Sequence, residues 1–301
     1  MQTSTSDQIR DTVRQAYGAI AAGRQASCCG GSGCCGAGES PSRELGYSVD
    51  DMASVPEGAD LGLGCGNPQA IAGLKPGERV LDLGSGAGFD AFLAARQVGP
   101  DGRVVGVDMT PEMVARATAN AAKAGLEHVD FRLGDIEHLP VETGAFDVIM
   151  SNCVINLAPD KGAVFREAYR VLAPGGRLAI SDVVAIGDLP AAILADPAAY
   201  TGCVAGAAAV ADLEHLIAAA GFSQVRITLR GEARAHLQAF DTDPTAAPVV
   251  SSALIEAVKP QTTGQAPKAC CDSVRLETCC EPDAKSTCCD ASAAGARCGC
   301  Q

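Results

Sequence analysis

The sequence lacks an excess of basic residues, and this absence excludes one class of partners. Lys and Arg together number 23, Asp and Glu number 36, and the formal net charge is −13. No basic field is therefore present to concentrate polyphosphate backbones or anionic lipid surfaces. We expect neither a nucleic acid nor a membrane among the partners of this chain.

Long hydrophobic runs are also missing. The opening segment MQTSTSDQIRDTVRQ has neither a basic n-region nor an apolar h-region, and no later apolar stretch is long enough to span a bilayer. These absences predict a cytoplasmic protein. Thiols stay reduced in that compartment, so the 15 cysteines are candidates for ligand binding or redox chemistry rather than for a disulfide scaffold.

The central part of the chain alternates short β-branched runs with helical ones between Arg79 and Asp182. This alternation predicts an α/β fold with a doubly wound, mostly parallel sheet. One helix boundary is marked clearly, because Thr110 is suited to the N-cap, Pro111 to the first helical position and Gly125 to the residue after the end.

The rest of the chain divides around this core. Residues 1–44 are expected to form an amphipathic helix, from Asp7 to Arg24, and a Cys-rich loop. Residues 45–184 are the expected core, and residues 185–260 the expected insertion and last strands. Residues 261–301 repeat cysteine pairs without periodic hydrophobicity, which predicts a disordered tail.

A glycine-rich turn predicts the cofactor site. The sequence LDLGSGAGFDAF places Gly84, Ser85, Gly86 and Gly88 between a buried strand and a helix, where a nucleotide-like cofactor can approach the backbone. Tight turns in α/β proteins often carry glycine without binding anything, so the turn alone leaves both interpretations open.

Two acidic positions strengthen this interpretation. Asp108 ends the second strand, where its carboxylate is able to accept hydrogen bonds from both hydroxyls of a ribose. Asp135 follows the third strand, where it is suited to an adenine amine while Ile136 packs on the ring. The alternative for Asp135 is a capping residue in a solvated loop.

Together these motifs resemble those of the class I S-adenosylmethionine methyltransferases. The resemblance implies a seven-stranded, Rossmann-like sheet with one antiparallel strand near its end. Asp82 heads the turn with a carboxylate for the ammonium group of methionine, which favours S-adenosylmethionine over NAD. The expected cofactor residues are Asp82, Gly84, Ser85, Gly86, Asp108, Met109, Asp135, Ile136 and Asn152.

Three separated cysteines are candidates for the acceptor site. Cys153 follows the strand FDVIM, Cys65 lies between glycines, and Cys203 lies in the segment expected to be an insertion after the fifth strand. Each of them is also compatible with a small buried hydrophobic residue. The sequence segments GLGCGNP, SNCVINL, TGCVAGA and LGYS resemble those of the arsenite methyltransferases, and the resemblance covers roughly Cys28 to Pro260.

That resemblance implies that Cys65, Cys153 and Cys203 ligate trivalent arsenic, and that an upstream cysteine has a redox role. For the redox cysteine, Cys28-Cys29 competes with Cys34-Cys35, and we take Cys35 from the later pair. Soft thiolates suit a soft metalloid and leave its lone pair free to attack the sulfonium methyl group.

No general base is needed for that attack, which agrees with the small number of histidines, four in all. His138 is the only candidate base, and a solvated or capping role competes with it. Arsenic oxidised by the transfer must regain two electrons, which paired thiols supply by forming a disulfide that thioredoxin or glutathione resets.

Two other functions fit part of the sequence. A methyltransferase of a small apolar, quinone-like substrate would share the fold and cofactor motifs, with the cysteines as packing residues. A thiol-rich protein that only binds a metalloid, zinc or copper would use the terminal cysteines. The tail pairs are themselves open to two interpretations, capture of arsenite on a flexible tether or a solvated tail without function.

Overall fold

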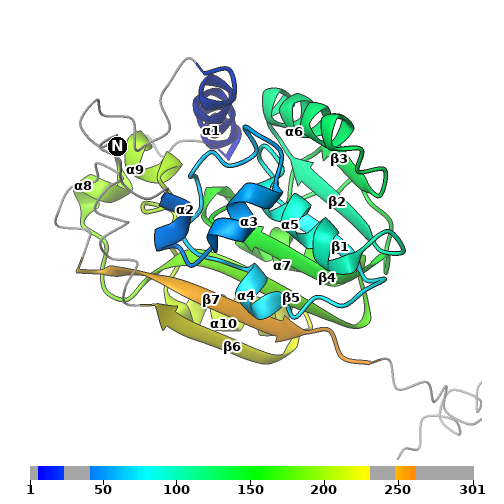
Figure 1. Cartoon of the computed structure of the whole chain (residues 1–301). Coiled ribbons are helices and arrows are strands. Elements are labelled where there is room, and N and C mark those ends of the chain that lie inside the picture. Colours follow the sequence, from blue (N-terminus) through cyan, green and yellow to red (C-terminus); the bar gives the residue numbers. More distant parts are fainter. Residues whose placement is uncertain (1–5, 24–40, 231–247, 262–301) are drawn as a thin grey trace, which may run out of the picture. The chain divides into compact units, whose positions relative to one another are not determined.

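The computed structural model of the chain describes residues 6–23, 41–230 and 248–261 (Figure 1). They belong to the compact unit of residues 1–260, apart from Gln261. The predicted Cys-rich loop, His236 and the predicted tail lie outside the described residues, and the proposed domain boundaries stay predictions. None of the described helices is long and apolar enough to cross a membrane.

The described strands form one seven-stranded sheet in the order β3-β2-β1-β4-β5-β7-β6. β7 pairs antiparallel with β5 and β6, whereas β1 to β5 are parallel to one another. The predicted sheet class and its antiparallel strand are confirmed. The strands are β1 Arg79–Leu83, β2 Arg103–Asp108, β3 Val129–Leu133, β4 Phe146–Asn152, β5 Leu172–Ala185, β6 Ser223–Arg230 and β7 Val250–Val258.

Helices cover both faces of this sheet (Figure 1). Alternate residues of one strand enter different apolar clusters: Leu81 packs with Phe165 on one face, and Val80 packs with Phe92 on the other. The central strands β1, β2 and β4 are mostly buried because helices cover both of their faces, whereas the edge strand β6 is largely exposed. The longer helices are α1 Ser6–Ala21, α5 Phe89–Val98, α6 Pro111–Ala124, α7 Lys161–Val171 and α10 Val210–Ala219.

Short helices fill the segments that the sequence pattern left unassigned. α2 (Pro41–Glu44), α3 (Val49–Ser54) and α4 (Gln69–Ala72) precede β1, and α8 (Ala191–Leu194) and α9 (Pro197–Thr201) follow β5. A 3-10 turn, η1 (Ile155–Leu157), follows β4. η1 follows the carboxyl end of β4 directly and contacts α9, so both lie at the edge where ligands bind in open α/β sheets.

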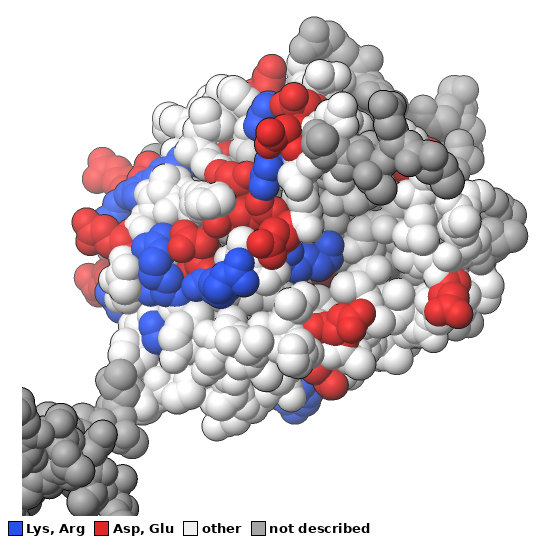
Figure 2. Space-filling view, turned by 180° about the vertical axis from the view of Figure 1, so that it is seen from behind, with Lys and Arg blue, Asp and Glu red and all other residues white. Residues whose placement is uncertain are grey.

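Several ion pairs join side chains at the surface of the molecule. Figure 2 shows acidic and basic side chains intermingled on the rear face. Arg79 pairs with Asp147 at 2.7 Å, and Arg132 with Asp130 at 3.0 Å. These carboxylates neutralise the basic side chains locally, so the charge of this face is mixed.

Candidate active site

A cavity of about 1090 Å³, partly open to solvent, lies at the carboxyl ends of β1, β2, β3 and β4. That volume includes open solvent at the mouth of the cavity. The lining includes Cys153 and all nine residues that the sequence assigned to the cofactor, namely Asp82, Gly84, Ser85, Gly86, Asp108, Met109, Asp135, Ile136 and Asn152.

The glycine turn after β1 holds the Asp108 side chain in place. The Gly86 N–H donates to Asp108 Oδ2 at 2.9 Å, and the Thr110 N–H donates to Asp108 Oδ1 at the same distance. Burial raises the pKa of the Asp108 carboxyl. Gly84 has a φ of +66°, and a Cβ atom there would lie 2.3 Å from a methyl carbon of Val154. Only glycine satisfies both constraints.

Asp82 carries the observation that best identifies the cofactor. Its side chain is buried and lines the cavity, but its Oδ2 atom has no hydrogen-bond partner among the described residues. Burial, followed by the nearby Asp90 charge, raises the Asp82 pKa well above its usual value. A buried carboxylate without a partner is costly, and the ammonium group of a bound methionine moiety would compensate it. The residues present therefore fit S-adenosylmethionine.

Asn152, at the end of β4, connects Asp90 in the cavity lining with the backbone of Cys65. Its Nδ2 donates to Asp90 Oδ2 at 3.1 Å and to the Gly66 carbonyl at 2.9 Å. Its Oδ1 accepts from the Cys65 N–H at 3.1 Å, and Tyr47 Oη donates to Asp90 Oδ1 at 2.8 Å. One side chain thus fixes both the methionine end of the cavity and the backbone of a candidate arsenic ligand.

The three candidate ligand cysteines converge. Cys65, Cys153 and Cys203 are each 1–3% exposed and belong to one apolar cluster. The sulfur atoms of Cys65 and Cys153 lie within 4.8 Å of each other and of an Asp182 oxygen, and the Cys153 thiol interacts with both other thiols. Cys203 Sγ donates to the Cys153 carbonyl at 2.9 Å. Cys35, the proposed redox cysteine, lies outside the described residues.

Burial determines the protonation state of the Cys65 and Cys153 thiols. It raises the pKa of Cys65 and raises that of Cys153 well above its usual value. Both groups are therefore protonated at neutral pH. Only Cys153 of the three also lines the cofactor cavity, so it is the link between the two parts of the site.

Two of these cysteines have an unusual backbone. Cys153 has a φ of 61° and Cys203 a φ of 64°, a left-handed conformation that costs non-glycine residues roughly 1–3 kcal/mol. Asn156 Nδ2 donates to the Cys203 carbonyl at 3.2 Å, and the Cys153 N–H donates to the Ser181 carbonyl at 2.8 Å. Strain of this kind is concentrated at functional sites because the surrounding contacts maintain it.

Asp182 anchors the turn that follows Cys153. Its Oδ2 accepts from the Ile155 N–H at 2.8 Å, and its Oδ1 accepts from its neighbour, the Val183 N–H, at 2.7 Å. Burial raises the Asp182 pKa to about 6, while these donors and the Lys161 charge limit the rise.

Histidine has no place in this arrangement. Within the described part of the chain, no histidine lines the cavity, and His138 is exposed. Its backbone N–H donates to the Asp135 carbonyl at 3.0 Å, and a ring nitrogen lies within 4.8 Å of a carboxylate oxygen of Asp135 and of Glu137. The site is built from carboxylates and thiols.

Comparisons with known proteins agree with this chemistry. A family model described as a methyltransferase domain matches residues 74–221. An arsenite methyltransferase from Halobacterium salinarum is 52% identical over 264 residues, which are 84% of this chain and 67% of that protein. The chain belongs to the arsenite methyltransferase family. A family member from Aquipseudomonas alcaligenes is 40% identical over 227 residues, 73% of this chain and 63% of that protein.

A solved structure supports the same family. The crystal structure of an arsenic(III) S-adenosylmethionine methyltransferase from Chlamydomonas reinhardtii has a TM-score of 0.55 and 34% identity, and the match covers 75% of each chain. The expected fold of an S-adenosylmethionine-dependent methyltransferase is thereby confirmed. The chain spans only about two thirds of the length of the two arsenite methyltransferases named above.

Sequence reasoning missed several polar residues of this arsenite methyltransferase site. Asp90 follows the glycine turn directly and Tyr47 lies in LGYS, so both had a weak signal in their position. Asn156 and Asp182 lie close to assigned motifs, but their role comes from contacts with backbone groups across the site. Arg10 had no signal, because its partner Glu137 lies 127 residues away in sequence.

Proposed function

We propose that this chain transfers the methyl group of S-adenosylmethionine to trivalent arsenic bound by Cys65, Cys153 and Cys203. One observation carries the proposal: the three buried thiols meet at Cys153, which also lines the cavity that contains Asp82 and Asp108. A methyl acceptor bound by these sulfur atoms would lie beside the cofactor.

Loading of arsenite follows from the protonated state of Cys65 and Cys153. Each thiol that binds forms an As–S bond, breaks an As–O bond and gives its proton to the departing hydroxide, which leaves as water. Three thiols thus release three water molecules and need no external base. The apolar surroundings of the cluster, including Val183 and Ile193, favour the neutral product over charged alternatives.

Transfer depends mainly on orientation. When bound, S-adenosylmethionine would supply an electrophilic methyl group, whose bond to sulfur would break as the As–C bond forms, with S-adenosylhomocysteine as the leaving group. Asp82 is suited to the ammonium group, Asp108 to the ribose and Asp135 to the adenine amine. Holding the acceptor by three sulfur atoms fixes its lone pair relative to these anchors, and such positioning lowers the barrier substantially.

The enzyme must also be reset. Methyl transfer raises arsenic to the pentavalent state, and two thiolates return it to the trivalent state by forming one disulfide, which gives up two electrons. We propose Cys35 as a participant in that disulfide, and thioredoxin or glutathione as the external reductant. The cycle requires a reducing compartment such as the cytoplasm.

The test is a methylation assay with S-adenosylmethionine, arsenite and a thiol, followed by chromatographic separation of the arsenic species with mass detection. Cys153→Ser should lower the rate of methylation at least about 100-fold, because it removes the shared ligand. The matched control Cys300→Ser should retain the full rate at saturating arsenite.

Two results would favour the other functions. Full activity in the serine variants of all three core cysteines would make them packing residues, as in a carbon or oxygen methyltransferase. Arsenite binding without any consumption of S-adenosylmethionine would leave a protein that only binds the metalloid.

A further inference from the structure

One face of α1 forms a wall of the cofactor cavity. Arg10, Val13 and Tyr17 recur at intervals of three and four residues, and all three line the cavity. Val13 is 1% exposed because it packs into the apolar cluster that contains Cys153. The helix therefore covers both the cofactor end and the thiol end of the site.

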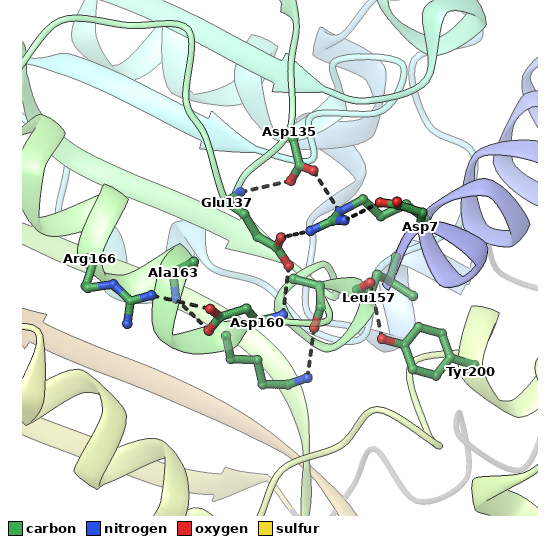
Figure 3. A network of polar contacts seen from close by, with 11 residues as sticks. Asp7, Asp135, Glu137, Leu157, Asp160, Ala163, Arg166 and Tyr200 are labelled. Carbon is green, nitrogen blue, oxygen red and sulfur yellow. Dashed lines mark hydrogen bonds and ion pairs between the residues drawn. The ribbon is translucent and has the colours of Figure 1, made fainter. Parts of the chain in front are cut away.

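Arg10 attaches this helix to the loop after β3. Its Nε lies 3.0 Å from Asp135 Oδ2, and a terminal nitrogen donates to the carboxylate of Glu137 (Figure 3). The Glu137 side chain is 2% exposed, and its other oxygen accepts from the Asp160 N–H at 2.8 Å. Arg10 is thus the counter-ion of a buried carboxylate, whose charge would be uncompensated if α1 moved away.

The far part of α1 is held by hydrogen bonds to backbone carbonyls. Tyr17 Oη donates to the Thr201 carbonyl at 3.1 Å, two residues before Cys203. The charged guanidinium of Arg116 donates through Nη1 to the Ala21 carbonyl, also at 3.1 Å. Arg10 differs from these anchors because its contacts with Asp135 and Glu137 join a cation to a carboxylate.

The thiols require an opening. Cys65, Cys153 and Cys203 are almost fully buried, so arsenite reaches them only when a covering element moves. α1 is suited to this movement, because Val13, the partly buried Tyr17, its packing on α6 and a few polar contacts hold it over the cavity. β4 and β5, in contrast, are hydrogen-bonded to neighbouring strands of the sheet.

We propose that α1 is a movable cover of the cofactor and arsenic sites, and that Arg10 is the positioning residue that keeps it closed. Arg10 acts through Asp135, whose Oδ1 accepts from the Glu137 N–H at 2.9 Å and whose Oδ2 faces the guanidinium. Asp135 also lines the cavity, and each of its oxygens retains a lone pair for a ligand. The inference rests on the cofactor assignment of the proposed function.

Calorimetric binding of S-adenosylmethionine to the full chain tests this inference. Arg10→Ala should raise the dissociation constant about tenfold, with little change in kcat once the cofactor is saturating. Arg10→Lys should restore part of the affinity, because lysine keeps the positive charge but lacks the planar guanidinium that contacts two carboxylates at once. The matched control is Arg14→Ala, since Arg14 is an exposed residue of the same helix that pairs with Asp11 at 2.8 Å.

Hydrogen exchange supplies a second readout that a purely structural role would not change. S-adenosylhomocysteine should slow amide exchange in residues 6–21 of the wild type and of Arg14→Ala, but not of Arg10→Ala. Equal affinity and equal protection in Arg10→Ala and Arg14→Ala would overturn the inference. If Arg10→Ala does not fold, Arg10→Lys is judged by the same criterion. Failure of the wild type to bind the cofactor would instead overturn the proposed function.

Discussion

At the scale of single residues, Asp82 is the cavity carboxylate with a buried oxygen atom that has no hydrogen-bond partner among the described residues. We predict that Asp82→Asn weakens binding of S-adenosylmethionine at least about tenfold, because the neutral amide loses the attraction to the ammonium group. Wild-type affinity should also increase as pH rises through the raised Asp82 pKa, since only the ionised form attracts the ligand.

Calorimetry at several pH values measures both effects. The control is Asp147→Asn, which removes a carboxylate paired with Arg79 on the surface and leaves the cavity intact. Equal affinity in Asp82→Asn and the wild type would contradict the assignment of the methionine end.

Asp182 gives a prediction for stability. Its pKa is about 6 in the folded state, against an ordinary value of 3.8 for an aspartate, so the folded protein binds more protons between about pH 4 and pH 6. Stability then falls as pH rises through this window, by up to about 3 kcal/mol from this group alone. The free energy of unfolding of the wild type should decrease by that amount relative to Asp182→Asn.

Urea unfolding of both proteins at a series of pH values measures this difference. A constant offset between the two curves is expected from the hydrogen bonds that the substitution disturbs, and it does not affect the comparison. A difference that stays the same from pH 4 to pH 6 would show that Asp182 is ionised throughout.

The residues of the cofactor site were predictable because each follows a strand at a fixed place. Asp82, Asp108 and Asp135 come at or just after the ends of β1, β2 and β3, and parallel strands bring those ends together. Arg10 and Asn156 were not predictable, because their roles depend on partners that only the folded chain brings near.

At the scale of elements, the glycine turn between β1 and α5 decides how closely a ligand approaches the backbone. We predict that Gly84→Ala disrupts this turn, because the added Cβ would lie 2.3 Å from Val154 and the φ of +66° is strained for alanine. Binding of S-adenosylmethionine should be lost and the melting temperature should fall.

Gly125→Ala is a suitable comparison, because Gly125 also has a positive φ, +66°, in the left-handed helical region, but no atom lies within 4 Å of its Cβ position. It should cost about 1 kcal/mol through the backbone alone and leave cofactor binding intact. Calorimetry and thermal unfolding compare the two variants. Equal effects would mean that the contact with Val154 is unimportant.

Elements with a strong local pattern were predicted well, and elements held by tertiary contacts were not. The expected helix after Thr110 is α6, with Gly125 at its end in the left-handed conformation, and the expected first helix is α1. The short helices α2, α4 and α8 have only four residues each. Segments of that length are not stable alone, so no sequence pattern marks them.

At the scale of the whole molecule, the last described residues determine where the chain is safely shortened. Lys259 Nζ donates to the carbonyls of Tyr169 and Leu172 at 2.7 and 2.8 Å. We predict that a chain ending at Gln261 keeps its stability and its methylation rate at saturating arsenite. A chain ending at Val258 should lose about 2 kcal/mol, because these charged hydrogen bonds disappear.

Thermal unfolding and the methylation assay compare these two chains with the full-length protein. The arsenite concentration dependence of the chain ending at Gln261 tests whether the tail captures the metalloid. An unchanged dependence would remove that role.

The thiol site belongs to the whole molecule, because three segments far apart in sequence supply it. Cys65 precedes α4, Cys153 follows β4 and Cys203 follows α9. Local sequence motifs indicated the three cysteines. Their convergence depends on the order of the strands in the sheet and on the contact of Asn156 with Cys203, and a local motif predicts neither.

X-ray absorption at the arsenic edge tests the central claim most directly. The sample is the chain ending at Gln261 with Cys28, Cys29, Cys34 and Cys35 replaced by serine, which leaves only the three core cysteines. We predict one bound arsenic per chain with three sulfur neighbours, and two sulfur neighbours with one oxygen after a further Cys153→Ser. An arsenic environment that Cys153→Ser leaves unchanged would contradict the account.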